Sequence, residues 1–233
     1  MNIKREIPNV TFETQAVELF HKLEFEILSG QFEPGARLVR RELTKRFGVS
    51  QATVSEALWR LESEGLAESA PMYGTRVTRV TPERVADETL LREALECQVA
   101  RRLAENFPKA RLAETEGLAD RVDAAMAHGA AYTRESMEIH AEFHIALARL
   151  TGSALLTREV ERIWRRHFMF FNAVSAQVLP VPDHWHRELL ARIAAGYPDD
   201  AERAMRHHVL YGSAYQLQVL GKVEADKSGK SKA

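Results

Sequence analysis

The clearest local signal in the chain is GVSQATVSEAL, residues 48–58. Gly48 allows a tight turn, and Ser50 is a good helix N-cap because its hydroxyl can accept a hydrogen bond from a backbone N–H of the first turn. A helix is predicted to follow over about 51–63, and a short one to precede the turn over about 40–47. Two helices joined in this way predict a helix-turn-helix, whose second helix enters the major groove of DNA.

The flanking sequence extends this motif into a winged domain. Apolar residues recur at helical spacing over 12–29, which predicts a first helix. Residues 66–70 and 75–80 read as two short strands around a turn that ends at Gly74. The first third of the chain is therefore predicted to be a winged helix-turn-helix.

The charge distribution agrees with DNA binding, although the total charge does not indicate it. The net charge of the chain is −1, but residues 35–61 hold six arginines and lysines against two glutamates. A local basic patch is what phosphate binding requires. Alone, such a patch is more often a solvated helix face. On the exposed side of the second helix, Gln51, Ala52, Thr53 and Ser55 are small or polar and could face base edges.

The composition excludes several other classes of protein. The chain has 233 residues, of which 45% are hydrophobic and 28% charged, enough for a buried core in one large or two ordinary domains. We expect no signal peptide and no membrane span, because no apolar run approaches about 20 residues. The single cysteine, Cys97, cannot form an internal disulfide. We therefore expect a cytoplasmic protein.

The rest of the chain is predicted to be helical. Thr81-Pro82-Glu83 has the pattern of a helix start, with an N-cap, a proline in the first position and an acid in the first turn. No strand signal follows. Helical patterns cover about 82–106, 109–128, 132–150, 154–178, 183–196 and 198–220. Six helices with short connections predict an antiparallel bundle, and a mainly α fold class overall.

These patterns divide the chain into four parts. We expect an N-terminal arm at 1–11, the winged helix-turn-helix at 12–80, and the all-helical domain at 81–221. The polar, lysine-rich residues 222–233 are predicted to be a disordered tail.

Residues 27–77 closely resemble the GntR family of bacterial transcriptional regulators. The helical region resembles the FadR-type (FCD) C-terminal domain of that family, through motifs such as Leu91-Arg92-Glu93-Ala94-Leu95-Glu96, Phe143-His144 and Met205-Arg206-His207-His208. The resemblance implies a homodimer on an inverted-repeat operator in double-stranded DNA, with an effector site in the helical domain. Together with the pattern above, it implies DNA contacts from Arg40, Arg41, Ser50, Gln51, Ala52, Thr53, Ser55, Tyr73, Gly74 and Thr75.

Two positions depart from the family pattern. The family usually has arginine where this chain has Gln51 and Ser55. Arginine typically reads guanine, whereas glutamine pairs better with adenine. We therefore expect an operator unlike the usual one of the family, and weaker phosphate contacts.

A metal site is predicted in the helical domain. His140 and His144 are four residues apart on one helix and share a face, so they could hold one ion. Such a pair alone is more often part of a hydrogen-bonded core. Many FadR-type domains hold a divalent metal with an Asp, a His four residues later and two further histidines. His144, His186 and His208 match the three histidine positions, and His140 stands at the Asp position.

Four neutral imidazoles would favour a divalent transition metal, with zinc expected first and nickel or iron as alternatives. His140 could instead point away and leave three ligands and a water. The remaining histidines, including His167, are interpreted as surface residues or as residues that support the ligands.

A small carboxylate is the expected effector, because family members often bind organic or sugar acids at the metal. Arg92 could hold its carboxylate with two hydrogen bonds. A salt bridge from Arg92 to Glu96 or Glu88 is an equal alternative. Trp164, Phe168, Phe171 and Trp185 could line the cavity, or belong to the core or to a dimer contact.

The sequence is compatible with three functions. The first is a regulator, most simply a repressor, whose operator affinity depends on the effector. The second is a metal-free ligand-sensing regulator of the acyl-CoA type. The third is a histidine-metal hydrolase, which would leave the winged helix unexplained and lacks a carboxylate placed as general base. The sequence favours the first and predicts no catalytic residue.

Overall fold

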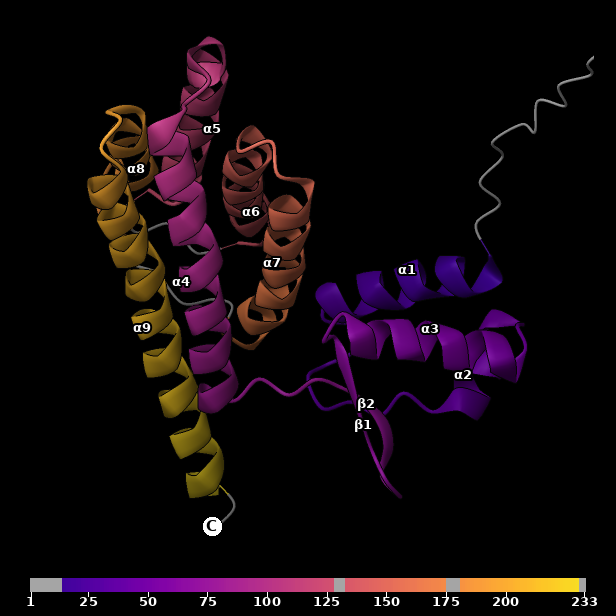
Figure 1. Cartoon of the computed structure of the whole chain (residues 1–233). Helices are drawn as coiled ribbons and strands as arrows, with labels where there is room; N and C mark the ends of the chain where they lie inside the picture. Colours follow the sequence, from indigo (N-terminus) through magenta and orange to yellow (C-terminus); the bar gives the residue numbers. More distant parts are fainter. Residues whose placement is uncertain (1–13, 128–132, 175–180, 231–233) are drawn as a thin grey trace, which may run out of the picture. The chain divides into compact units, whose positions relative to one another are not determined.

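The computed structural model describes residues 14–127, 133–174 and 181–230 (Figure 1), with the side chains of 170–174 and 222–230 excepted. The expected N-terminal arm lies outside the described residues. The chain divides into two compact units, Met1–Thr78 and Arg79–Ala233. The sequence placed the boundary between 80 and 81.

The first unit is a three-helix motif with a two-stranded wing. Helices α1 and α2 both pack against α3, and β1 pairs antiparallel with β2 so that Ala67 faces Val77 and Ala70 faces Gly74. The elements are α1 (Gln15–Leu28), α2 (Arg40–Phe47), α3 (Gln51–Ser63), β1 (Ala67–Ala70) and β2 (Gly74–Val77). The predicted winged helix-turn-helix is confirmed.

The turn between α2 and α3 forms as its residues dictate. Gly48 ends α2 with a φ of 66°, a left-handed conformation that glycine adopts without a Cβ clash. Ser50 caps α3, since its hydroxyl accepts a hydrogen bond from the Thr53 backbone N–H. Leu58 and Leu61 on α3 are fully buried, as is Leu23 on α1. The apolar face of α3 therefore anchors it, and its polar face remains outside.

In the second unit, the described residues outside the connections are all helical. The elements are α4 (Pro82–Glu105), a short 3-10 turn η1 (Lys109–Arg111), α5 (Leu112–Ala125), α6 (Arg134–Leu150), α7 (Ala154–Val174), α8 (Trp185–Ala194) and α9 (Pro198–Lys230). Helices α4 and α9 run side by side along most of their length (Figure 1). Helix α5 packs on α6 and α8, and α7 packs on α4 and α6. Thr81 caps α4 and Pro82 is its first residue, as the sequence predicts.

The end of the chain differs from expectation. Helix α9 continues to Lys230, through most of the segment that the sequence predicted to be a disordered tail from residue 222. Lysine, glutamate and alanine in this segment are good helix formers, and they extend a helix that α4 already stabilises by packing. Among the described residues, none of the helices combines the length and the apolar character needed to cross a bilayer.

The core of the second unit surrounds the middle of α6. Phe143 and Leu147 of α6, Leu103 of α4 and Trp164 of α7 are essentially inaccessible to solvent. The same face of α6 carries His140 and His144. Two polar side chains thus enter the centre of an apolar bundle, where each ring nitrogen needs a partner.

Candidate nucleic-acid interface and metal centre

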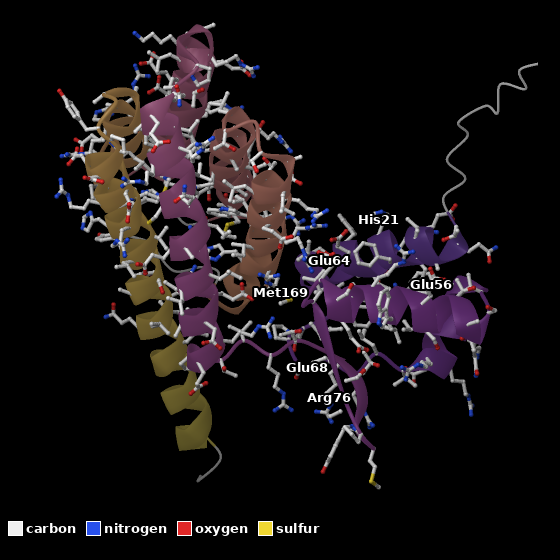
Figure 2. The ribbon with its side chains drawn as sticks, viewed as in Figure 1. His21, Glu56, Glu64, Glu68, Arg76 and Met169 are labelled. Atoms are coloured by element: carbon white, nitrogen blue, oxygen red, sulfur yellow. The ribbon has the colours of Figure 1, made fainter. Side chains whose placement is uncertain are left out.

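The outer face of α3 presents the predicted reading residues. Gln51, Ala52 and Ser55 are exposed, whereas Thr53 is half-buried. The Thr53 hydroxyl lies 2.8 Å from the Ser50 hydroxyl, so both side chains are partly used at the start of the helix. Glu56 lies on the same helix (Figure 2) and pairs with Arg60 at 3.0 Å.

A concave surface of about 300 Å³ lies between the start of α2, the start of α3 and the tip of the wing. It brings together six of the ten predicted DNA-binding residues, which are far apart in sequence. Its lining is Arg37, Leu38, Val39, Arg40, Arg41, Gln51, Tyr73, Gly74 and Thr75. Three arginines around one hollow form a surface suited to a phosphate backbone.

Two residues of this surface have roles that the sequence did not assign. Thr75, expected to contact DNA, is only 3% exposed. Its Oγ1 accepts a hydrogen bond from Arg40 Nη2 at 3.4 Å and lies 2.8 Å from Ser69 Oγ. Thr75 therefore orients the Arg40 side chain from the protein interior. Arg37 donates from Nη2 to the Tyr73 carbonyl at 3.5 Å, which links the basic patch to the wing.

The four predicted metal-ligating histidines converge in the second unit. All four rings are buried, and one ligand atom from each lies within 4.8 Å of the others. His144 Nε2 is 3.1 Å from His140 Nε2 and 3.2 Å from His208 Nε2. The structure therefore turns His140 inward, not away from the other three.

This spacing fits a cation better than hydrogen bonds alone. A ring nitrogen carries either one proton or one lone pair, so His144 Nε2 cannot make two well-formed hydrogen bonds at once. Two nitrogens bound to one zinc ion at about 2.0–2.1 Å would stand about 3.3–3.4 Å apart in a tetrahedral site. The observed separations are close to this value.

A carboxylate orients His186. Asp123 Oδ1 lies 2.7 Å from His186 Nδ1, and the backbone N–H groups of His186 and Arg187 donate to the same carboxylate at 2.9 and 3.0 Å. The carboxylate can only accept, so Nδ1 carries the proton and Nε2 keeps its lone pair. Among the described residues, the buried Nε2 has no hydrogen-bond partner. This is the arrangement of a metal-ligating histidine with its supporting carboxylate.

A second carboxylate lies close to His144 without the angle of a well-formed hydrogen bond at Nδ1. Glu96 Oε2 lies 3.0 Å from His144 Nδ1, and Glu96 Oε1 accepts hydrogen bonds from Arg92 Nε at 3.1 Å and from Trp164 Nε1 at 2.9 Å. The guanidinium of Arg92 also lies over the Trp164 ring, 4.5 Å from its centroid. Of the two interpretations of Arg92, the salt bridge to Glu96 is thus present, and the effector contact stays a prediction.

The environment favours the neutral form of His140, His186 and His208. Burial lowers the pKa of His140 and His208 well below the usual value, and the neighbouring imidazoles add to this shift. Burial also lowers the pKa of His186, although Asp123 opposes it. Burial alone would raise the pKa of Glu96, but Arg92 and His144 outweigh it and hold that pKa far below its usual range. Neutral imidazoles with free lone pairs are the form that binds metal.

The supporting residues Asp123 and Trp164 were not assigned these roles from the sequence. Asp123 is 63 residues from His186 and has no local signal. His167, interpreted as a surface or supporting residue, is in fact buried, with its Nε2 3.0 Å from Gln216 Nε2. His128 lies outside the described residues.

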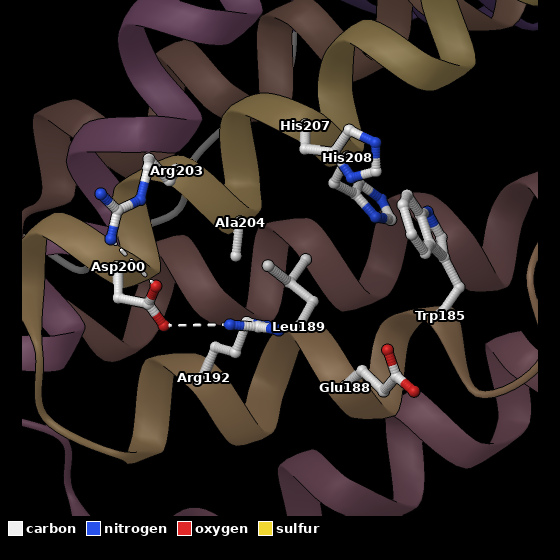
Figure 3. Close-up of a pocket in the computed structure, with 9 residues that line it drawn as sticks. All are labelled: Trp185, Glu188, Leu189, Arg192, Asp200, Arg203, Ala204, His207 and His208. Carbon is white, nitrogen blue, oxygen red and sulfur yellow. Dashed lines mark hydrogen bonds and ion pairs between the residues drawn. The ribbon is translucent and has the colours of Figure 1, made fainter.

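A second hollow, of about 350 Å³, lies between α8 and α9 (Figure 3). The exposed His207 lines it, as does Trp185, whose ring stacks on His208 with 5.3 Å between centroids. Arg192 and Arg203 both pair with Asp200 at 3.2 Å. Trp185 therefore packs directly against one of the four clustered histidines.

Comparisons with protein families agree with both units. The family model for bacterial regulatory proteins of the gntR family matches residues 15–77, and the FCD domain model matches 89–210. The HTH-type transcriptional repressor RspR of Escherichia coli K12 is 25% identical over 196 residues, covering 82% of this chain and 84% of its own. A probable D-xylose utilization operon transcriptional repressor of Paenarthrobacter nicotinovorans is 29% identical over 202 residues, covering 86% and 88%.

Solved structures share the fold. E. coli McbR/YncC superposes with a TM-score of 0.67 at 22% identity, over 89% of this chain and 99% of that one. A transcriptional regulator GntR from Rhodococcus sp. RHA1 gives the same TM-score at 24% identity, over 90% and 99%. With a winged helix-turn-helix matched in the first unit and an FCD domain over the second, the chain belongs to the GntR family of bacterial regulatory proteins and is a DNA-binding transcriptional regulator.

Proposed function

We propose that this regulator is a repressor that senses a small organic acid through a divalent metal held by His140, His144, His186 and His208. The observation that carries the proposal is the convergence of four buried ring nitrogens within 4.8 Å, with Asp123 orienting the His186 ring from behind and Glu96 close to the His144 ring. Carboxylates in this position fix the tautomer and raise the basicity of ligating histidines.

Zinc is the metal that the donor set favours first. Imidazole nitrogens suit zinc, nickel, copper and iron, whereas magnesium and calcium prefer oxygen. When bound, the metal would supply a positive charge. With four histidine ligands, a carboxylate oxygen would enter as a fifth ligand, an expansion that zinc allows. The charge of Glu96 is balanced by Arg92, so it does not cancel the attraction of the site for an anion.

Arg92 is the proposed second contact of the effector. Its positive charge acts on the cluster. Burial and the other histidines make the larger contributions to the lowered pKa of His140 and His208, and Arg92 lowers both values further. Its two hydrogen bonds to Glu96 use Nε and Nη2, and Nη1 takes no part in them. An effector carboxylate placed between the metal and Nη1 would be attracted by the positive charges of both the metal and Arg92.

Regulation requires that the effector bind two arrangements of a homodimer with different affinity. We propose that the acid-bound arrangement holds the two winged domains in a form that fits the inverted-repeat operator less well. The family typically forms dimers, and named relatives are repressors.

The metal is tested by elemental analysis of protein purified without an affinity tag. We expect about one equivalent of transition metal per chain, and its loss in the triple variant His144→Asn, His186→Asn, His208→Asn. His207→Asn is the matched control, because His207 is exposed on the same helix beside His208. Stoichiometric metal in the triple variant would rule this site out.

The effector is tested by DNA retardation with a panel of small organic acids, using metal-loaded and metal-free protein. An acid should weaken operator binding only when the metal is present, and Arg92→Lys should reduce that response. If an acid acts equally on metal-free protein, sensing does not pass through this centre.

The operator sequence is a separate proposal about α3. We propose that exposed Gln51 pairs with adenine, where related proteins use arginine for guanine; such a bidentate contact discriminates by about 1–3 kcal/mol. Binding-site selection should return half-sites with adenine at one position, and Gln51→Arg should shift that position to guanine. Selection of the same guanine-centred half-site by both proteins would contradict the proposal.

A further inference from the structure

One large apolar side chain stands on the outer face of α3. Trp59 is 66% exposed, more than most large hydrophobic residues of the described chain. The other two tryptophans, Trp164 and Trp185, lie in the second unit, and Trp164 is fully buried. A single exposed apolar residue needs no partner. Tryptophan, however, combines a large apolar surface with an N–H donor, and this combination suits an interface.

The helical geometry places Trp59 on the reading stripe. At about 100° per residue, Trp59 lies about 20° around the axis from Ala52 and about 40° from Ser55. Both of these residues are exposed, and the buried face of α3 lies on the opposite side of the helix. Trp59 therefore faces the same partner as the residues at the start of the helix.

The neighbours of Trp59 leave room for its ring. Side chains on a helix lean toward its N-terminus, so the indole is directed toward Ser55 and Ala52. Both are small. Glu56, also on the outer side, has its charge balanced by Arg60 at 3.0 Å. Glu62, three residues after Trp59, accepts a hydrogen bond from Ser69 Oγ at 2.6 Å. The side of the indole toward Ser55 and Ala52 is therefore lined by small uncharged side chains, and a phosphate backbone can approach from there.

We infer that Trp59 contacts the operator at the wall of the major groove, with its ring on a deoxyribose and its Nε1–H donated to a phosphate oxygen. Trp59 is eight residues beyond Gln51, or about 12 Å along the helix axis. If Gln51 contacts base edges in the major groove, Trp59 lies against the sugar-phosphate backbone at the side of that groove. The inference rests on the DNA-binding function of the first unit.

This contact would partly replace what the chain lacks at Gln51 and Ser55, where related regulators carry arginine. The replacement differs in kind, because an indole has no charge and releases no counterion from DNA. The contribution of Trp59 to affinity should therefore be nearly independent of salt, unlike that of Arg41.

The first test measures affinity for operator DNA across salt concentrations. Trp59→Ala should weaken binding about 10-fold at every salt concentration and leave the salt slope unchanged, and Trp59→Phe should weaken it about 3-fold because packing remains but the N–H is lost. Arg41→Ala should reduce the salt slope by about 0.9. Phe25→Ala is the matched control: Phe25 is 60% exposed on α1, and its loss should not alter binding.

The second test uses the intact protein labelled with 5-fluorotryptophan. Three fluorine resonances are expected, and Trp59→Phe identifies one of them. Only that resonance should shift when operator DNA is added. A Trp59 resonance that is unaffected by DNA, or one already shielded from solvent in the free dimer, would overturn the inference and assign the indole to a contact within the protein. If the parent protein binds no duplex at all, the DNA-binding function fails, and not this contact alone.

Discussion

The two units of the molecule each contain an arginine–glutamate pair four residues apart on a helix, in opposite surroundings. Glu56 and Arg60 on α3 are 3.0 Å apart, and both side chains are substantially exposed. Arg92 and Glu96 on α4 are 3.1 Å apart and almost completely buried. The same local spacing thus serves a solvated surface in one unit and the centre of a polar network in the other.

This contrast matches what each unit has to do. The first unit keeps Arg37, Arg40, Arg41 and the Trp59 indole exposed, where an external polyanion can reach them. The second unit buries the four clustered histidines together with Arg92 and Glu96 and packs these groups against one another, so that a small site keeps a defined geometry. Sequence spacing alone does not distinguish the two cases.

Glu96→Gln is expected to have the largest effect. It leaves Arg92 charged and buried without its partner, which typically costs about 3–5 kcal/mol of unfolding free energy. Glu56→Gln, its exposed counterpart, should cost about 0.5 kcal/mol or less. Urea unfolding of both variants measures the difference. Equal losses would mean that the buried pair contributes no more than the exposed one.

Asp123→Asn should weaken metal binding about 10- to 100-fold, because the amide no longer fixes the His186 tautomer. The matched control is Asp120→Asn, one turn away on α5, where the exposed Asp120 accepts a hydrogen bond from the half-buried side chain of Arg187 at 2.9 Å. Competition with a chelator of known affinity gives both constants. Similar affinities for the two variants would remove Asp123 from the account of the site.

His167 should make stability depend on pH. Burial lowers the pKa of His167 well below its usual value, and the charge of Arg92 adds to this. The unfolded chain therefore takes up a proton near pH 6.5 that the folded chain does not. Unfolding free energy should fall as pH drops below about 6.5, by up to about 1.4 kcal/mol per pH unit for this residue.

His167→Gln should accordingly lose less stability than the parent between pH 7 and pH 5.5 in urea unfolding. His21→Gln is the control, because His21 is exposed on α1. Parallel stability curves for His167→Gln and the parent would show that this ring titrates alike in the folded and unfolded chains.

Ser50→Ala should destabilise the protein by about 1 kcal/mol, less than Glu96→Gln, because it removes the hydrogen bond that caps α3. Thermal unfolding measures the loss. Ser63→Ala, at the exposed other end of α3, should cost less, since its hydroxyl bonds a carbonyl that water can also reach. A larger loss from Ser63→Ala would contradict the assigned cap.

The first unit was predictable because its signals are local. Gly48, Ser50 and the apolar spacing of α3 act within a few residues, and the structure has each of them as the sequence indicated. Thr75 is the exception. Its burial depends on the pairing of β1 with β2 and on Arg40, which lies 35 residues away in sequence.

The second unit was predictable at the level of helices and of the histidine pattern, but not of the contacts around it. The supporting role of Asp123 depends on how α5 meets α8, and the partner of His167 depends on how α7 meets α9. Such distances are set by packing between helices, which leaves no periodic trace in the sequence.

The histidine centre is assembled by every one of the α-helices that the structure describes in the second unit. Helix α6 supplies two rings and α8 and α9 one each, while Glu96, Asp123 and Trp164 come from α4, α5 and α7. A shift of the cluster by a few tenths of an ångström therefore changes the packing of all six helices, α4 to α9. Binding of one small molecule at the cluster can thus move all the helices of the domain directly, without a relay from one helix to the next.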